Sequence, residues 1–254
     1  MVPDIQTYAP HVQAVFGRLP ASDPRHLPCS VADQSARGSE PLIVALEHLL
    51  ALPESRFTVS EILDLLDVPA LRARFGFDES GLPTLRRWIE DAGIRWGLDG
   101  AQKGSLNLPA LEQNSWRFGL RRMLLGYAVG DGESLDGIAP YADVGGLDAA
   151  LLGPLSLLLD QLEHHWQQLR LPATPDVWSD RLHGLLADFF DRSDAEDAQR
   201  MNRLDEALDE WQQACREADF AEPIPLAIVR EYWLQAIDES RLSQRFMGGA
   251  VSFG

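Results

Sequence analysis

A group of arginines and tryptophans between residues 86 and 127 has the side chains most suited to binding chemistry. This stretch holds seven basic and four acidic side chains, whereas the rest of the chain holds 15 basic and 35 acidic ones. Guanidinium groups pair with phosphates and indole rings stack on bases, so the composition is typical of a groove that follows a nucleic-acid strand. The predicted DNA-binding residues, here named the arginine–tryptophan island, are Arg86, Arg87, Arg95, Trp96, Trp116, Arg117, Arg121 and Arg122.

The spacing within residues 115–127 sharpens this prediction, because the segment holds three arginines and no acid. Arg117 and Arg121 are four residues apart and share one face of a helix, while Arg122 lies beside Phe118. Two other interpretations stay open. In the first, the arginines of the island pair with acidic helices and connect the two halves of the chain. In the second, they contact a protein partner.

Other chemistry has little support in the sequence. The chain contains no phosphate-binding loop GxxxxGK[ST], no dinucleotide-binding GxGxxG after a strand, no HExxH and no GxSxG. His164 and His165 are adjacent, so on a helix they face different directions and cannot chelate one ion alone; with Glu163 they are expected on a solvated helix face. We therefore predict no catalytic residue and no metal ligand.

An acidic run covers residues 188–222, with 12 acidic and four basic side chains. A carboxylate pair for a metal ion is conceivable there, but a solvated face of a helical bundle is the favoured interpretation. Four tryptophans fall in apolar stripes at helical spacing and are expected in the core. They are Trp166, Trp178, Trp211 and Trp233.

Length and composition place the chain among ordinary globular proteins. It has 254 residues, 45% of them hydrophobic and 24% charged, which excludes a wholly disordered chain. The net charge of -17 argues against wholesale binding to nucleic acid or anionic membranes, yet it permits one basic patch. The two cysteines, Cys29 and Cys215, are expected to be free thiols. Because neither a signal peptide nor a transmembrane run is visible, we expect a cytoplasmic protein without membrane contact.

The elements that would position the island are helices nearly throughout. Apolar residues recur at helical spacing, and Thr58 and Glu61 form a capping box at the start of one helix. Residues 94–114 are predicted as a loop, and residues 27–31 as a short extended piece. The helices expected in the first half lie around residues 12–19, 41–52, 59–66, 71–75, 82–93 and 115–127.

The second half is predicted as an up-and-down helical bundle. Apolar stripes run along residues 155–169, 175–189, 201–215 and 225–237. We expect an N-terminal helical part, 1–129, and a C-terminal bundle, 147–254, joined by a 130–146 loop into one structural domain. Strand-like pieces at residues 2–5 and 250–253 suggest that the chain is part of a longer polypeptide. The fold class is all-α with short strand remnants at the two ends.

Several segments, in the same order, resemble the RecC family, the gamma subunits of the bacterial helicase–nuclease exodeoxyribonuclease V, or RecBCD. The similarity extends from end to end of the chain. The segments that carry it are Val2–Gln6, Leu65–Pro69, Arg87–Trp88 with Gly93–Gly97, Trp116–Leu120 with Met123–Tyr127, and Ser243–Phe246.

The resemblance implies a helical insertion, called 2B in helicases, within a superfamily-1-like layout that has lost its ATP site. It implies a non-catalytic role in subunit assembly and DNA guidance within a double-strand-break repair complex. ATP and magnesium would be bound by the partner helicase–nuclease and helicase subunits, and double-stranded ends and unwound strands would be the DNA. A pure protein-interaction scaffold without DNA contact is the alternative.

Overall fold

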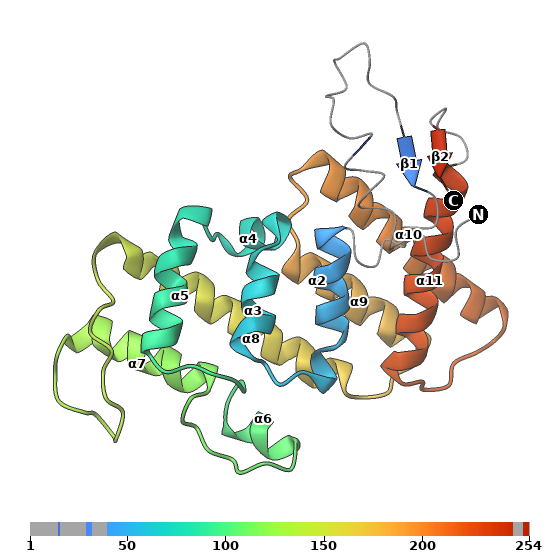
Figure 1. The fold of residues 1–254 in the computed structure, drawn as a ribbon. Coiled ribbons are helices and arrows are strands. Elements are labelled where there is room, and N and C mark those ends of the chain that lie inside the picture. The colour runs from blue at the N-terminus through green and yellow to red at the C-terminus, as the bar shows by residue number, and fades with distance from the viewer. Residues whose placement is uncertain (1–14, 16–28, 32–39, 246–250, 254) are drawn as a thin grey trace.

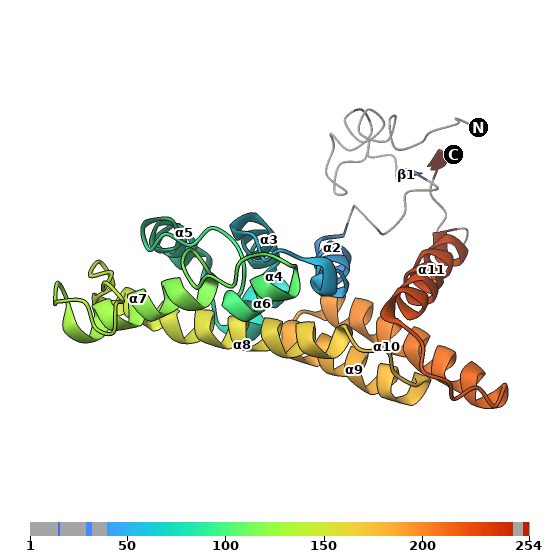
Figure 2. The same ribbon diagram turned by 90° about the horizontal axis from the view of Figure 1, so that it is seen from below.

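The computed structural model describes residue 15 and residues 29–31, 40–245 and 251–253 (Figure 1). Within these residues the protein is almost entirely helical, which confirms the predicted all-helical class. Two layers are visible in Figure 2: helices α8–α10 form one, and helices α2–α5 cover it. Helices α7 and α11 lie toward opposite ends of the molecule.

The helices of the first half begin where the sequence supplies a cap or a proline. Thr58 and Glu61 form the predicted capping box at the start of α3. Ser115 caps α7 by accepting a hydrogen bond from the Phe118 amide, and Pro41 occupies the first turn of α2. The helices are α2 (Pro41–Leu50), α3 (Val59–Leu66), α4 (Pro69–Phe75), α5 (Leu82–Asp91), α6 (Gly100–Ser105) and α7 (Trp116–Val129), with 3₁₀ turns η1 (Leu52–Glu54) and η2 (Glu79–Gly81).

The second half contains four long helices, as the apolar stripes predict. A 3₁₀ turn η3 (Gly146–Leu151) leads into α8 (Leu152–Leu169), which is followed by α9 (Pro175–Phe189), α10 (Ala195–Glu217) and α11 (Leu226–Arg245). All four predicted core tryptophans are buried, and Trp178 and Trp233 are almost completely so. The indole nitrogen of Trp233 donates to the Leu204 carbonyl and ties α11 to α10.

Two short strands accompany the helices. Strand β1 (Cys29–Val31) and strand β2 (Val251–Phe253) pair in parallel, with Ser30 opposite Ser252. They agree with the extended pieces predicted near residues 27–31 and 250–253. The predicted strand at 2–5 lies outside the described residues, as does the helix at 12–19 apart from the helical Val15.

One prediction about the first half is wrong: residues 94–114 are not a continuous loop. Helix α6 forms within them because the Asp99 side chain accepts a hydrogen bond from the Gln102 amide, 2.7 Å away. The helix is short, so no long apolar stripe announces it. An acidic N-cap, Asp99, three positions before Gln102 is the local signal for this helix start.

A second correction concerns Glu163, His164 and His165, which do not form a solvated face together. His164 is exposed, but His165 is 1% exposed and its Nε2 lies 2.9 Å from Asp188 of α9. Glu163 pairs with Arg117 of α7. The three side chains point in different directions around the helix axis, so the packing of the neighbouring helices determines which of them contacts a partner.

Two glycines allow α7 to approach its neighbours closely. A Cβ atom at Gly119 would collide with the Ile94 side chain, and one at Gly126 would collide with the Tyr141 carbonyl. The Tyr141 amide also donates to the Arg122 carbonyl at 2.9 Å, so the loop after α7 lies directly on that helix. These contacts need a backbone without a side chain at both positions.

Helices among the described residues are all too short or too polar to cross a membrane. Cys215, on α10, is a free, half-buried thiol. Burial, together with the nearby Asp176 carboxylate, raises its pKa above the ordinary value.

Two glycine substitutions should have opposite effects on stability. Gly126→Ala should lower the free energy of unfolding by about 1–3 kcal/mol, the usual cost of overpacking. Gly184→Ala in α9, where a Cβ meets nothing within 4 Å, should raise it by about 1 kcal/mol through helix propensity. Urea denaturation measures both, and equal effects of the two changes would contradict the close approach at Gly126.

Candidate functional site

The island is assembled where the end of α5 meets the start of α7. Gly93, with a φ of 79°, turns the chain after α5. The segment that follows then pairs with the start of α7: the Arg95 amide donates to the Asn114 carbonyl, and the Trp116 amide donates to the Gly97 carbonyl, both at 2.9 Å. These bonds bring together residues that the sequence places some 20 positions apart.

Arg117 faces inward, toward helix α8. Its guanidinium lies 2.6 Å from the Asp160 carboxylate and 2.5 Å from that of Glu163, and its side chain is 19% exposed. Burial by itself lowers the pKa of Arg117, but the hydrogen bonds that its guanidinium donates to Glu163 and Asp160, with the charges of these carboxylates, outweigh it and raise the pKa above the ordinary value. Arg117 therefore holds a permanent charge and links α7 to α8.

Arg122 joins α7 to two backbone segments. Its Nη1 donates to the Ala92 carbonyl at the end of α5, and its Nε donates to the Ala139 carbonyl at 3.0 Å. A cation at a helix C-terminus satisfies carbonyls that have no partner within the helix. Arg122 thus connects α5, α7 and the loop between the two halves of the chain.

The tryptophans of this region lie mostly inside the molecule. Trp116 is fully buried and donates from its indole nitrogen to the Phe57 carbonyl at 2.8 Å. Trp96 is half-buried, and the ammonium of Lys103 lies 4.7 Å from its ring centre. In this arrangement Trp116 presents no open ring face on which a base would stack.

Lys103, the single lysine of the chain, is a structural residue that sequence reasoning missed. It is 3% exposed and donates to the carbonyls of Leu111 and Gln113 at 3.1 and 2.8 Å. Desolvation lowers its pKa, against the attraction of Glu112 and Asp99. The sequence shows only that Lys103 is the single lysine, and this fact does not predict a buried ammonium group.

Four arginines of the island remain at the surface. Arg86 and Arg121 are about half exposed; the first lies 3.0 Å from Asp67 and the second 3.9 Å from Glu112. Exposed pairs of this kind contribute little energy and exchange readily with solvent or a ligand. Arg87 and Arg95 are exposed as well, and Arg95 donates to the Ile94 carbonyl. These guanidinium groups are available to a binding partner.

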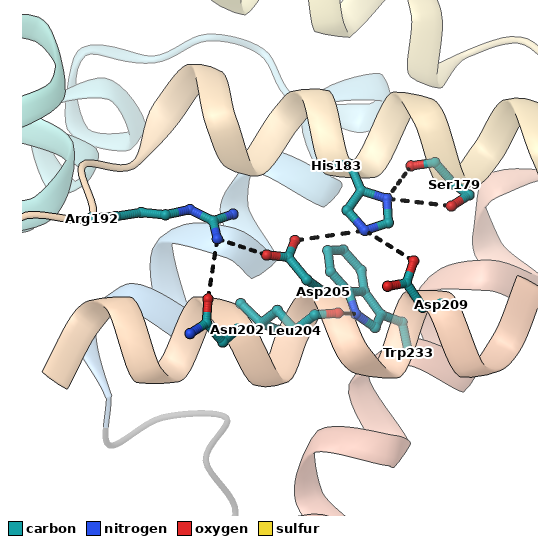
Figure 3. A network of polar contacts seen from close by, with 8 residues as sticks. All are labelled: Ser179, His183, Arg192, Asn202, Leu204, Asp205, Asp209 and Trp233. Carbon is teal, nitrogen blue, oxygen red and sulfur yellow. Dashed lines mark hydrogen bonds and ion pairs between the residues drawn. The ribbon is translucent and has the colours of Figure 1, made fainter. Parts of the chain in front are cut away.

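The acidic run folds mainly into α10, where Asp205 and Asp209 face polar side chains of residues that precede the helix (Figure 3). Asp205 lies 2.8 Å from Arg192, and both Asp205 and Asp209 face Nε2 of His183 on α9, at 3.7 and 3.5 Å. The other ring nitrogen of His183 lies 2.9 Å from the Ser179 carbonyl. No group of three or more histidine, cysteine or acidic residues in the described part of the chain is arranged to hold a metal ion.

The described residues thus define an all-helical, two-layer domain with an arginine-rich corner. A family described as the fourth domain of the RecBCD enzyme subunit RecC matches residues 39–241. Because this match covers most of the chain, the chain belongs to that family, and the resemblance drawn from the sequence segments is confirmed.

Relatives from three bacteria support the same assignment. The chain is 42% identical over 259 residues to the RecBCD enzyme subunit RecC of Escherichia coli K12, covering 99% of this chain and 22% of that protein. It is 32% identical over 255 residues to the subunit from Haemophilus influenzae, covering 100% and 22%. It is 31% identical over 233 residues to the RecBCD enzyme subunit RecC of Mycobacterium tuberculosis H37Rv, covering 89% of this chain and 20% of that protein. The chain spans about a fifth of the length of these relatives.

Removal of the inward-facing arginine should destabilise the fold. Arg117→Ala should lower the free energy of unfolding by about 2 kcal/mol, because hydrogen bonds to charged groups contribute about 1.5–3 kcal/mol and Asp160 is partly hydrated. The matched control is Arg121→Ala on the same helix, which should change stability by less than about 0.5 kcal/mol. Urea denaturation distinguishes the two; an equal effect of both substitutions would show that Arg117 is not a special link.

His165 should make stability fall in mild acid. Desolvation lowers its pKa, and the Asp188 carboxylate only partly compensates. Below about pH 6.5 the unfolded chain therefore takes up a proton that the folded chain does not, and the free energy of unfolding decreases as the pH falls.

The measurement is the free energy of unfolding against pH for the wild type and for His165→Phe. The substitution should flatten the slope between about pH 6.5 and 5. An unchanged slope in His165→Phe would assign the acid sensitivity to other groups.

Proposed function

We propose that this domain is a non-catalytic part of the RecC subunit of a bacterial helicase–nuclease that repairs double-strand breaks. The observation that carries the proposal is the family match over residues 39–241. In this proposal the domain is the 2B-like helical insertion of a subunit that is built like a superfamily-1 helicase but has lost its ATP site. The complex works in the cytoplasm. The partner helicase–nuclease and helicase subunits bind ATP and magnesium, while this domain serves subunit assembly and guides DNA ends and unwound strands.

The surface arginines support a role in DNA guidance. Arg86, Arg87, Arg95 and Arg121 are exposed on a protein of net charge -17, so they form a local exception to an acidic surface. A few guanidinium groups in such a setting attract a phosphate backbone only where it passes this corner, because acidic surfaces elsewhere repel it. This is the behaviour expected of a guide rather than of a general DNA-binding protein.

The inward-facing residues support the alternative, a pure protein-interaction scaffold. Arg117 is paired with two carboxylates, Arg122 with two backbone carbonyls, and Trp116 is buried. These three members of the island have structural partners in the folded chain. An experiment that distinguishes DNA guidance from a pure scaffold must therefore target the exposed arginines.

We also propose that the two predicted parts, 1–129 and 147–254, act as one structural unit. A single cluster of buried hydrophobic residues includes Leu71 and Met123 of the first part together with Leu158 and Leu185 of the second. The Arg117 pairs cross the same boundary. A unit of this kind holds its binding surfaces in fixed positions, which suits an assembly role.

DNA guidance predicts salt-sensitive binding of a forked duplex to this chain. The combined variant Arg86→Ala, Arg87→Ala, Arg95→Ala and Arg121→Ala should weaken binding. It should also reduce the slope of log affinity against log salt by about 0.9 for each phosphate that an arginine no longer neutralises. Fluorescence anisotropy of a labelled fork at several salt concentrations measures both quantities.

The control for charge is Arg216→Ala, which removes an arginine at the far end of α10 and should leave the slope unchanged. Binding of the fork that is equally strong in the combined variant would exclude the exposed arginines as the DNA-binding groups. Absence of binding at low salt would favour the scaffold, and association with partner subunits would then be measured directly.

A further inference from the structure

A groove with a cavity volume of about 190 Å³ lies away from the arginine–tryptophan island, between η1, the end of α8 and the start of α11. This volume is smaller than that of a pocket that encloses a whole small ligand, and it suits one or two side chains of a bound segment. Three prolines contribute to its walls, and two arginines stand among the lining residues. The lining residues are Pro53, Glu54, Leu169, Arg170, Pro172, Pro225, Leu226, Ala227 and Arg230.

The walls of this groove are held in place by the fold. Ala173 and Ile224 exchange two backbone hydrogen bonds, of 3.1 and 2.9 Å, which join the segment after α8 to the segment before α11. Arg181 of α9 donates to the carbonyls of Gln168 and Leu171 and secures the end of α8. Proline rings restrict the same two segments further. A ligand would therefore meet a formed site and would not have to order it.

Apolar surface is exposed beside the groove. Leu169 and Leu226 form buried parts of its lining. Leu171 and Ile228, on the same two segments, are 59% and 55% exposed.

The charge of the groove is basic, against the charge of the whole protein. Arg170 lies with its guanidinium 4.4 Å from the centre of the Trp166 ring, and among the described residues no carboxylate forms an ion pair with it. Arg230 is about one-third exposed and lies 3.7 Å from Glu54, whose side chain is 73% exposed. Such a loose pair is readily exchanged for a better carboxylate partner.

We propose that this groove binds an extended acidic segment of a partner protein, with an apolar side chain set between carboxylates. The apolar side chain occupies the space between Leu169 and Leu226, and the carboxylates pair with Arg170 and Arg230. Charge complementarity favours an acidic partner, because both guanidinium groups would repel a basic segment.

A peptide fits the groove better than a nucleic-acid strand. A strand without sequence preference needs an open aromatic face for its bases, and here the Arg170 guanidinium covers the Trp166 ring. A nucleic-acid strand also carries a negative charge at every phosphate, so one phosphate would lie close to the Glu54 carboxylate and be repelled by it. A peptide places its charges apart and supplies the apolar group that the lining requires.

The test is fluorescence anisotropy of a labelled peptide in which leucines are flanked by glutamates, titrated with this chain. We expect saturable binding that weakens at least about tenfold in Arg170→Glu/Arg230→Glu. Ala227→Trp, a substitution at an exposed position in the lining, should fill the groove and weaken binding without a change of charge. Arg56→Glu, an exposed position outside the lining, is the charge control and should bind as the wild type does.

Thermal unfolding of each variant shows whether it is folded. Equal binding of a peptide with glutamine in place of glutamate, insensitivity to both groove variants, or no binding at all would overturn the proposal. Displacement of the peptide by a thymidine oligonucleotide would assign the groove to nucleic acid and overturn it as well. The inference rests on the proposed assembly role. Absence of fork binding by the wild-type chain would contradict DNA guidance and leave the peptide result unchanged, so the failure of that function and the failure of this proposal are distinguishable.

Discussion

Burial of one side of helix α8 is the constraint on which the arrangement of the other helices depends. The helix places Leu155, Leu158, Leu162 and Leu169 almost entirely out of water. It contacts α4, α7 and α9 and the turn η1, so elements from both layers are positioned by the same apolar surface. Full burial of a leucine contributes about 1.5–3 kcal/mol, which makes this helix a large part of the folding energy.

Polar links then select one orientation among those that burial alone would allow. Arg117 meets two carboxylates of α8, His165 of α8 meets Asp188 of α9, and His183 of α9 faces two carboxylates of α10. Arg117 and His165 are the most enclosed of these groups, and each would be costly to bury without its partner. A sliding or rotated packing would separate the pairs, so their contribution is chiefly to the uniqueness of the structure.

The same links explain how a basic cluster divides into two roles. Arginines that point into the helix layers are used by the fold, and those that point outward keep free donors for a ligand. The groove proposed to bind an acidic segment, which includes Arg170 and Arg230, is formed by other elements of the domain. A rigid body with separate basic surfaces suits a subunit that holds partners and DNA in fixed relative positions, as proposed above.

The helical class, most helix starts, the buried tryptophans and the family could be predicted without knowledge of the packing. These follow from local physics: a capping box at Thr58, a proline at residue 41 and apolar residues at helical spacing act within a few positions. The tertiary structure decided which arginines of the island are free, that His165 is buried and that Lys103 is enclosed by backbone carbonyls. Arg117 and Glu163 are 46 residues apart. Periodicity shows which side of a helix is apolar, but which polar group of another helix it meets depends on the packing of the whole chain.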